Sequence, residues 1–74
     1  LANEALSALV NHAFGAMGLH RLEADIDPRN AGSIRSVDRL GFKLEGHLRE
    51  RYFVAGEIQD SLIYALLAPE WKSR

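Results

Sequence analysis

The sequence predicts a small α+β (α/β) domain in which a helix, a strand, a second helix and two more strands follow in order and build a mixed sheet. Three observations predict this order. Apolar residues recur at helical spacing over residues 3–17, alternate with charged residues over 20–26, and alternate again from Phe42 onward. With 74 residues the chain forms at most one domain, near the lower size limit for a single apolar core.

The first element is an amphipathic helix over residues 3–17. Asn3 is its expected N-cap, and Gly18 is its expected end because glycine tolerates the left-handed conformation that closes a helix. The predicted apolar stripe comprises Leu6, Leu9, Val10, Ala13 and Met17.

The second and third elements are a strand over residues 20–26 and a short helix. Asp27-Pro28 ends the strand, because proline cannot donate a ladder hydrogen bond. Asn30 is then the expected N-cap of the helix, and Gly41 its expected end. The predicted buried residues are Leu22, Ala24 and Ile26 of the strand and Ile34, Val37 and Leu40 of the helix.

The last two strands form a hairpin with its turn within residues 55–57. Strict alternation puts Glu50 and Tyr52 on one face of the first strand and Arg49 and Arg51 on the other. The return strand is apolar on both faces from residue 61, so we expect an interior strand or one covered on both sides. Two short helices cover too little of such a sheet, so we expect it to bury surface against other residues or a second subunit. Pro69 should end the strand, leaving a short tail.

Composition excludes several classes of protein. The net charge of -1 and the pI near 6.3 argue against a nucleic-acid binder that relies on bulk electrostatics. The chain has no cysteine, and its three histidines are scattered over separate elements, so we expect neither disulfide nor metal site. We also expect no membrane span and no signal peptide, which fits a cytoplasmic protein.

One combination of residues carries a family resemblance. Asn30 followed by Ser33, the stop Leu40-Gly41-Phe42 and the subsequent Glu45-Gly46 together resemble the GNAT superfamily of acetyl-coenzyme A-dependent N-acetyltransferases. The similarity is greatest to the branch that acetylates ribosomal-protein N-termini. It covers nearly all 74 residues and corresponds to the C-terminal half of the GNAT fold. The resemblance therefore implies one partial domain over 1–74, with the Gly-rich phosphate loop lying before Leu1, and little or no activity in this piece alone.

The resemblance also implies a cofactor site for acetyl-coenzyme A. The start of the first helix, with Asn3, would receive the pyrophosphate, since helix N-termini attract phosphate. Asn30 would contact the pantetheine arm, Ser33 would lie near the thioester and protonate the departing thiolate, and Arg39 would lie near the phosphorylated ribose. From the residues alone, Asn30 is equally an ordinary N-cap and Ser33 an ordinary first-turn residue, so both interpretations stay open.

The general base is not assigned by the sequence. The family glutamate that serves this role falls at Tyr52 in this chain. Tyr52 is a candidate for lining the acceptor pocket or carrying a proton, and Glu50 a candidate substitute base, although both are also ordinary strand residues. His47 is a further candidate base. Asp60 matches a frequent family aspartate, for which we expect a structural role near the hairpin.

Two functions follow from these observations. The first is an N-acetyltransferase portion that moves acetyl from acetyl-coenzyme A to a primary amine, either a protein N-terminus or a small amine. The alternative is a non-catalytic module that forms a homodimer through its apolar last strand, because an open strand edge favours pairing between chains. The first predicts coenzyme affinity that depends on Asn30. The second predicts concentration-dependent dimerisation without such affinity.

Overall fold

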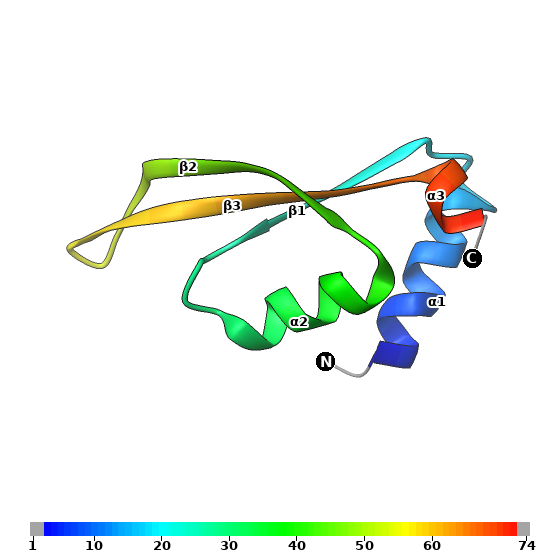
Figure 1. Cartoon of the computed structure of the whole chain (residues 1–74), viewed down its shortest axis with the longest axis horizontal. Helices are drawn as coiled ribbons and strands as arrows, with labels where there is room; N and C mark the ends of the chain where they lie inside the picture. The colour runs from blue at the N-terminus through cyan, green and yellow to red at the C-terminus, as the bar shows by residue number, and fades with distance from the viewer. Residues whose placement is uncertain (1–2, 73–74) are drawn as a thin grey trace.

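The computed structural model describes residues 3–72 as three helices and three strands. In chain order they are α1 (Asn3–Phe14), β1 (Arg21–Ile26), α2 (Ala31–Leu40), β2 (Lys43–Val54), β3 (Glu57–Leu67) and α3 (Ala68–Lys72). Figure 1 shows α1 and α2 on the same side of the sheet and the hairpin of β2 and β3 reaching far beyond β1. The predicted order is confirmed, and the expected tail after β3 forms the short helix α3, which begins at Ala68.

The strands pair in the order β1-β3-β2, and both pairings are antiparallel. β3 therefore occupies the interior of the sheet, as its two apolar faces predicted. The parallel pairing that a mixed sheet requires does not occur among residues 3–72. The reason is that β1 and β2, which α2 connects, are not neighbours in the sheet. β3 lies between them and pairs with each in the antiparallel sense.

The end of α1 differs from its prediction. The helix ends at Phe14 rather than at residue 17, because hydrogen bonds beyond this point reach further back along the chain. The Met17 N–H bonds the carbonyl of His12, and the Leu19 N–H bonds that of Ala13, six residues earlier. Gly18 has the positive φ of 65° expected at such an end.

Both ends of α2 confirm the sequence prediction. The Asn30 side-chain oxygen accepts a hydrogen bond from the Ser33 N–H at 3.1 Å, which is the N-cap contact. At the other end Gly41 adopts a φ of 93°, and its N–H bonds the carbonyl of Asp38. These local contacts fix the position of α2 directly after the turn that follows β1.

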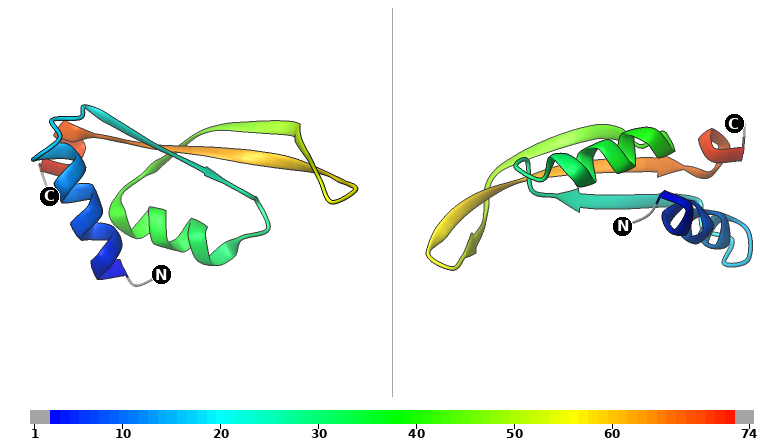
Figure 2. Two further views of the ribbon diagram at one scale, coloured as in Figure 1. Left: turned by 180° about the vertical axis from the view of Figure 1, so that it is seen from behind. Right: turned by 90° about the horizontal axis from the view of Figure 1, so that it is seen from below.

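The core lies between the helices and the sheet. The core consists of two clusters of buried residues, and Phe42 packs against both of them. The first cluster comprises Val10, Phe14, Leu40, Leu66 and Ala68, and the second comprises Ile26, Val37, Leu62 and Tyr64. Figure 2, which also views the molecule from below, shows α1 and α2 on the same side of the sheet with their axes inclined to each other.

The hairpin departs from regular alternation. The register of β2 against β3 shifts between Leu44 and Gly46 and again between Leu48 and Tyr52, where β2 carries extra residues. Glu50 lies in the second irregularity with a positive φ of 52°. The first shift gives β2 one extra residue, so Leu48 lies on the face opposite Leu44, and the alternation counted from Phe42 fails there. The second shift gives β2 two extra residues, so Leu48 and Tyr52 share a face and the alternation fails only for the residues between them. The predicted turn is confirmed, with positive φ at both Ala55 and Gly56.

Candidate functional site

A cleft of about 750 Å³ lies on the helix side of β1. α2 supplies most of its wall, β1 contributes two apolar residues, and α1 contributes one. The lining residues are Leu6, Ala24, Ile26, Asn30, Gly32, Ser33, Arg35, Ser36, Val37 and Arg39. The cleft therefore brings together three residues that the sequence nominated for cofactor binding, namely Asn30, Ser33 and Arg39.

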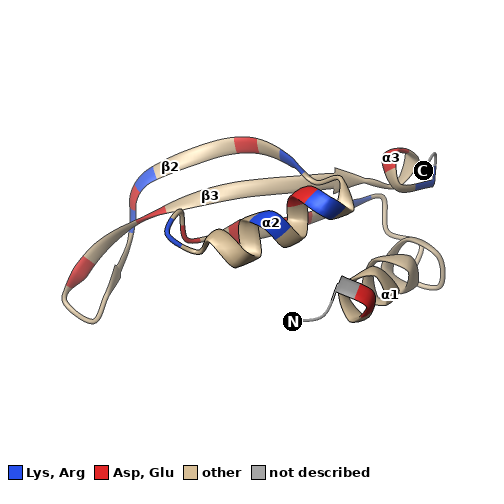
Figure 3. Ribbon diagram, turned by 60° about the horizontal axis from the view of Figure 1, so that its bottom comes forward, with Lys and Arg blue, Asp and Glu red and all other residues tan. Residues whose placement is uncertain are grey.

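The lining of this cleft is cationic. Arg35 and Arg39 stand one helical turn apart on α2, and no aspartate or glutamate is among the described residues that line the cleft. Figure 3 shows both basic and acidic residues on α2 and an acidic residue near the start of α1. Two guanidinium groups beside backbone and hydroxyl groups suit an anionic ligand with phosphate groups.

Asn30 has a second hydrogen-bonding group besides its capping oxygen. The Oδ1 atom accepts the Ser33 N–H, and the Nδ2 amide makes no hydrogen bond to another described residue. Asn30 is exposed and Ser33 is half-buried, and both line the cleft. The cap thus orients the side chain while its amide N–H groups remain available to a ligand.

A second group of polar side chains meets on the opposite face of the sheet. The Tyr52 hydroxyl donates a hydrogen bond to Asp25 Oδ2 at 2.6 Å, and the Ser61 hydroxyl donates to Asp25 Oδ1. Arg51 Nη1 lies 3.9 Å from Asp25 Oδ2, and its guanidinium lies 5.4 Å from the centre of the Tyr52 ring. Arg51 and Tyr52 therefore approach the same carboxylate, and the predicted opposition of these two side chains is wrong because the irregularity in β2 interrupts the alternation.

These contacts shift two pKa values in opposite directions. The hydrogen bond from Ser61, and then that from Tyr52, lowers the pKa of Asp25 below its ordinary value, which favours the carboxylate. The hydrogen bond to Asp25 raises the pKa of Tyr52, which favours the neutral phenol. At neutral pH the pair is accordingly an anion beside a neutral proton donor.

Comparison with known proteins identifies the family. A family model described as an acetyltransferase (GNAT) domain matches residues 1–43, more than half of the chain. The chain belongs to the GNAT acetyltransferase family. The predicted resemblance is confirmed by this match.

Named relatives agree with this assignment. The chain is 37% identical over 70 residues to a probable N-acetyltransferase, YjcK, of Bacillus subtilis, covering 95% of this chain and 39% of that protein. It is 32% identical to the [ribosomal protein uS5]-alanine N-acetyltransferase of Escherichia coli, covering 92% of this chain and 35% of that enzyme. The chain thus spans about two fifths of the length of these curated relatives.

Among solved structures, the chain resembles mutant forms of the spermidine/spermine N-acetyltransferase SpeG from Vibrio cholerae. The superposition has a TM-score of 0.93 at 25% sequence identity and covers 99% of this chain and 44% of that one. Together with the family match, this superposition confirms the GNAT-type fold that the sequence predicted.

The remaining candidates of this GNAT chain are spread over three elements. Asn3 is the first residue of α1, and its side chain lies outside the described residues. Leu6, three residues further along, does line the cleft, so the first turn of α1 borders it. Glu50 is exposed within the irregular part of β2, and its predicted shared face with Tyr52 rested on the alternation that is interrupted there.

Asp60 holds this irregular segment in place. Its Oδ1 accepts the Glu50 N–H at 2.8 Å, and its Oδ2 lies 2.7 Å from His47 Nε2. These contacts, the backbone hydrogen bond first, lower the pKa of Asp60. The structural role expected for Asp60 near the hairpin agrees with this geometry, and His47 is its partner.

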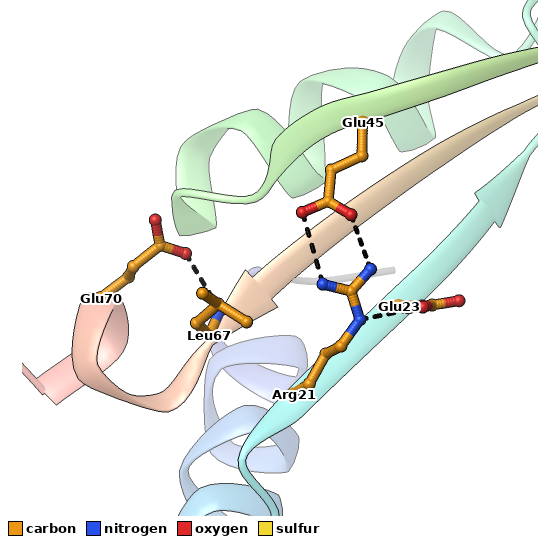
Figure 4. Close-up of polar contacts among 5 residues, drawn as sticks. All are labelled: Arg21, Glu23, Glu45, Leu67 and Glu70. Carbon is orange, nitrogen blue, oxygen red and sulfur yellow. Dashed lines mark hydrogen bonds and ion pairs between the residues drawn. The ribbon is translucent and has the colours of Figure 1, made fainter.

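A second cross-sheet contact lies on the same face as Asp25. Arg21 of β1 reaches over β3 to Glu45 of β2, with Nη2 2.6 Å from Oε1, and also bonds Glu23. Figure 4 shows this guanidinium between the two carboxylates, with the helices behind the sheet, and Glu70 accepting the Leu67 N–H nearby. Glu23 and Glu45 thus share one arginine, whereas Asp25 has the more distant Arg51.

Sequence reasoning found Tyr52 and missed Asp25 and Ser61. Asp25 looked like one of three charged residues on the solvent face of a strand. Ser61 did leave a signal, because it is a hydroxyl within an otherwise apolar run, and the structure buries it to 1% exposure. A buried serine needs a partner, and here the partner is Asp25.

Residues 3–72 contain neither a metal-binding cluster nor a membrane-spanning helix. Within them no three histidine, aspartate or glutamate side chains converge in a way that could hold a metal ion. No helix in this range has the length and apolar character needed to cross a membrane.

Proposed function

We infer that this chain is the C-terminal part, over residues 1–74, of an N-acetyltransferase domain that moves acetyl from acetyl-coenzyme A to a primary amine. The observation that carries this proposal is the cationic cleft beside α2, where Asn30, Ser33 and Arg39 lie together. The family match supports the acetyltransferase class. The complete acetyl-transfer site would also need the Gly-rich phosphate loop expected before Leu1.

The cleft fits the chemical groups of the coenzyme. Asn30 would donate its amide N–H groups to the pantetheine arm, and Arg39 would neutralise a phosphate, with Arg35 beside it. The start of α1, with Asn3, would attract the pyrophosphate through its helix dipole. The apolar Ala24 and Ile26 would border the uncharged part of the arm.

The reaction would proceed by direct attack. The neutral amine nitrogen forms a bond to the thioester carbonyl carbon, the carbon–sulfur bond breaks, and the thiolate takes a proton, for which Ser33 is our candidate donor. The nitrogen must release one proton, and Glu50 is our candidate acceptor, directly or through water. Tyr52, neutral by its raised pKa, would line the acceptor side of the site.

The acceptor is a primary amine in this proposal. One relative is named for the alanine of ribosomal protein uS5 and another for spermidine, and both are amines. A cytoplasmic location belongs to the same proposal. The comparisons give no support to the alternative of a non-catalytic dimerisation module, and a homodimer remains a prediction.

Calorimetric titration of acetyl-coenzyme A tests the proposal. We expect saturable binding to the wild-type chain and weaker binding to Asn30→Ala. Asn30→Ser is the matched control for helix stability, because serine also caps helices well but lacks the amide N–H groups. Equal weakening in both variants would assign the loss to the ligand contact, whereas recovery in Asn30→Ser would assign it to the cap. An absence of heat at millimolar coenzyme would contradict a cofactor site in this chain.

Acetyl transfer itself is measured by thiol release. The chain contains no cysteine, so any thiol that appears during the assay comes from the coenzyme. In a longer protein that also carries the Gly-rich loop, we expect Ser33→Ala to lower kcat with little change in coenzyme affinity, since the hydroxyl acts only on the departing thiolate. An unchanged kcat would remove Ser33 from the mechanism.

A further inference from the structure

Asp25 makes side-chain contacts with both of the other strands of the sheet. It belongs to β1, yet its carboxylate receives hydrogen bonds from Tyr52 of β2 and Ser61 of β3. Each oxygen has a different donor, so the plane of the carboxylate is fixed from two sides. Despite these bonds, the side chains of Asp25 and Arg51 remain 38% and 41% exposed, which leaves the carboxylate accessible from solvent.

β1 connects this carboxylate to the proposed coenzyme site. Ala24 and Ile26, on either side of Asp25 in the sequence, line the cleft on the helix side of the sheet. Because successive side chains of a strand point to opposite faces, Asp25 lies on the other face of the same strand segment. The Asp25 side chain is 38% exposed on that face, so an acceptor can reach its carboxylate there.

The charges around Asp25 favour the binding of a cation at its carboxylate. Its low pKa keeps it anionic at neutral pH, and the raised pKa of Tyr52 keeps that partner uncharged. The other carboxylates on this face, Glu23 and Glu45, are both bonded to Arg21. Among the described residues, the cationic group nearest Asp25 is that of Arg51, at 3.9 Å, a distance beyond that of a direct hydrogen bond.

We propose that Asp25, oriented by Tyr52 and Ser61, binds the protonated primary amine of the acceptor on the face of β1 opposite the coenzyme cleft. This inference rests on the proposed function and names the residue that recognises its acceptor. Asp25 acts as an anchor rather than as the base, because a carboxylate stabilised as the anion is a weak proton acceptor. Release of the proton before attack falls to another group.

The irregular segment of β2 explains why Tyr52 reaches Asp25. Asp60 accepts the Glu50 N–H and so satisfies a backbone group that the extra residues take out of the ladder. The strand can then present Arg51 and Tyr52 toward the same carboxylate, which strict alternation forbids. Asp60 is in this sense a positioning residue for the acceptor side of the site.

Equilibrium binding of a simple amine tests the inference without requiring turnover. The probe is n-butylammonium, followed by NMR at the amides of Tyr52 and Ser61, with n-butanol as the uncharged control ligand. We expect saturable binding of the amine only, weakened about tenfold or more in Asp25→Asn, the scale expected for loss of one charge-assisted contact. Glu23→Gln, which removes the same charge from the same face of β1, should leave the dissociation constant within about twofold.

A second variant keeps the test decisive if Asp25→Asn fails to fold. Arg51→Gln removes the cation nearest Asp25 and should tighten amine binding, the opposite direction from a general loss of structure. No saturable binding to the wild type, equal affinity in Asp25→Asn, or equal weakening in Glu23→Gln would overturn the inference.

Failure of the inference is distinguishable from failure of the proposed function. If acetyl-coenzyme A binds and depends on Asn30 while Asp25→Asn leaves amine affinity unchanged, only the acceptor assignment is wrong. If the amine binds at Asp25 but the coenzyme does not bind, the acetyltransferase proposal is wrong. Where turnover is measured, Asp25→Asn should raise KM for the amine about tenfold with a smaller change in kcat.

Discussion

The two halves of β3 differ in their strand partners and in how far their surroundings are buried. From Leu62 to Leu67 β3 pairs with β1, from Leu62 to Ala65 it also pairs with β2, and it lies over the helices, where Leu66 is 1% exposed. The remainder belongs to the hairpin arm, residues 48–61, where β2 is its only partner. There Phe53 is 74% exposed and Ile58 61% exposed. Both halves carry apolar residues, but only the first half buries them.

This difference places stability and the candidate site in separate regions. The packed half holds the apolar clusters and carries α2 with its cleft. Tyr52 and Ser61 come from the hairpin arm, and they meet Asp25 where the arm leaves the packed half. A chain built in this way can change its proposed acceptor side without disturbing its core, since apolar burial is the main source of stability.

The largest effect is expected in the packed half. Leu66→Ala removes a side chain buried in the cluster that α1 and α2 form against β3, and it should lower the free energy of unfolding by about 2–5 kcal/mol. Urea denaturation measures the change. A loss below about 1 kcal/mol would mean that the core on the helix side is loosely packed, and the contrast between the two halves would disappear.

Two glycines with similar backbone conformations sharpen the contrast. Gly41 ends α2 with a φ of 93°, and Gly56 lies at the hairpin turn with a φ of 81°. Alanine at either position is strained by about 1–2 kcal/mol. We expect Gly41→Ala to lower the global stability by this amount, and Gly56→Ala to increase hydrogen exchange mainly at the end of the arm. Equal global losses would show that the arm and the packed half unfold as one unit.

The contact that joins the two regions should be sensitive to acid. Because the pKa of folded Asp25 lies below its ordinary value of 3.8, its contribution to stability is present above that value and is lost as the pH falls through the lower folded pKa. In Asp25→Asn this part of the pH dependence should be missing. Urea midpoints measured between pH 7 and pH 3 test it.

Asp38→Asn is the control for this pH series. The Asp38 side chain makes no hydrogen bond or ion pair to another described residue, so its removal should leave the wild-type profile in place. Identical profiles for wild type and Asp25→Asn would contradict the contact between the arm and β1.

The smallest effect is expected at the exposed end of the arm. Phe53→Ala should change the free energy of unfolding by no more than about 0.5 kcal/mol, as is usual for exposed positions. The same urea measurement applies. A loss above about 1 kcal/mol would indicate that Phe53 is covered in solution, as by a second copy of the chain, and sedimentation at increasing protein concentration would identify that case.

The sequence predicted the local structure well because local rules determine it. Asn30 caps α2 and Gly41 ends it, since a side-chain oxygen and a left-handed residue act within one turn. The two apolar faces of β3 likewise predicted that it is the middle strand of the sheet. The resemblance around Asn30, Ser33 and Gly41 also predicted the family that the comparisons confirmed.

The tertiary structure alone decided which side chains meet. The extra residues in β2 end the period of two, so counting along the chain separated Arg51 from Tyr52 while the fold directs both to Asp25. The pairing of β1 with β3 likewise brings Asp25 to Ser61, 36 residues away. Helix caps and strand ends depend on neighbours a few residues apart and can therefore be predicted from the sequence. A strand irregularity and a contact across three strands depend on how distant segments pair, and only the assembled sheet specifies them.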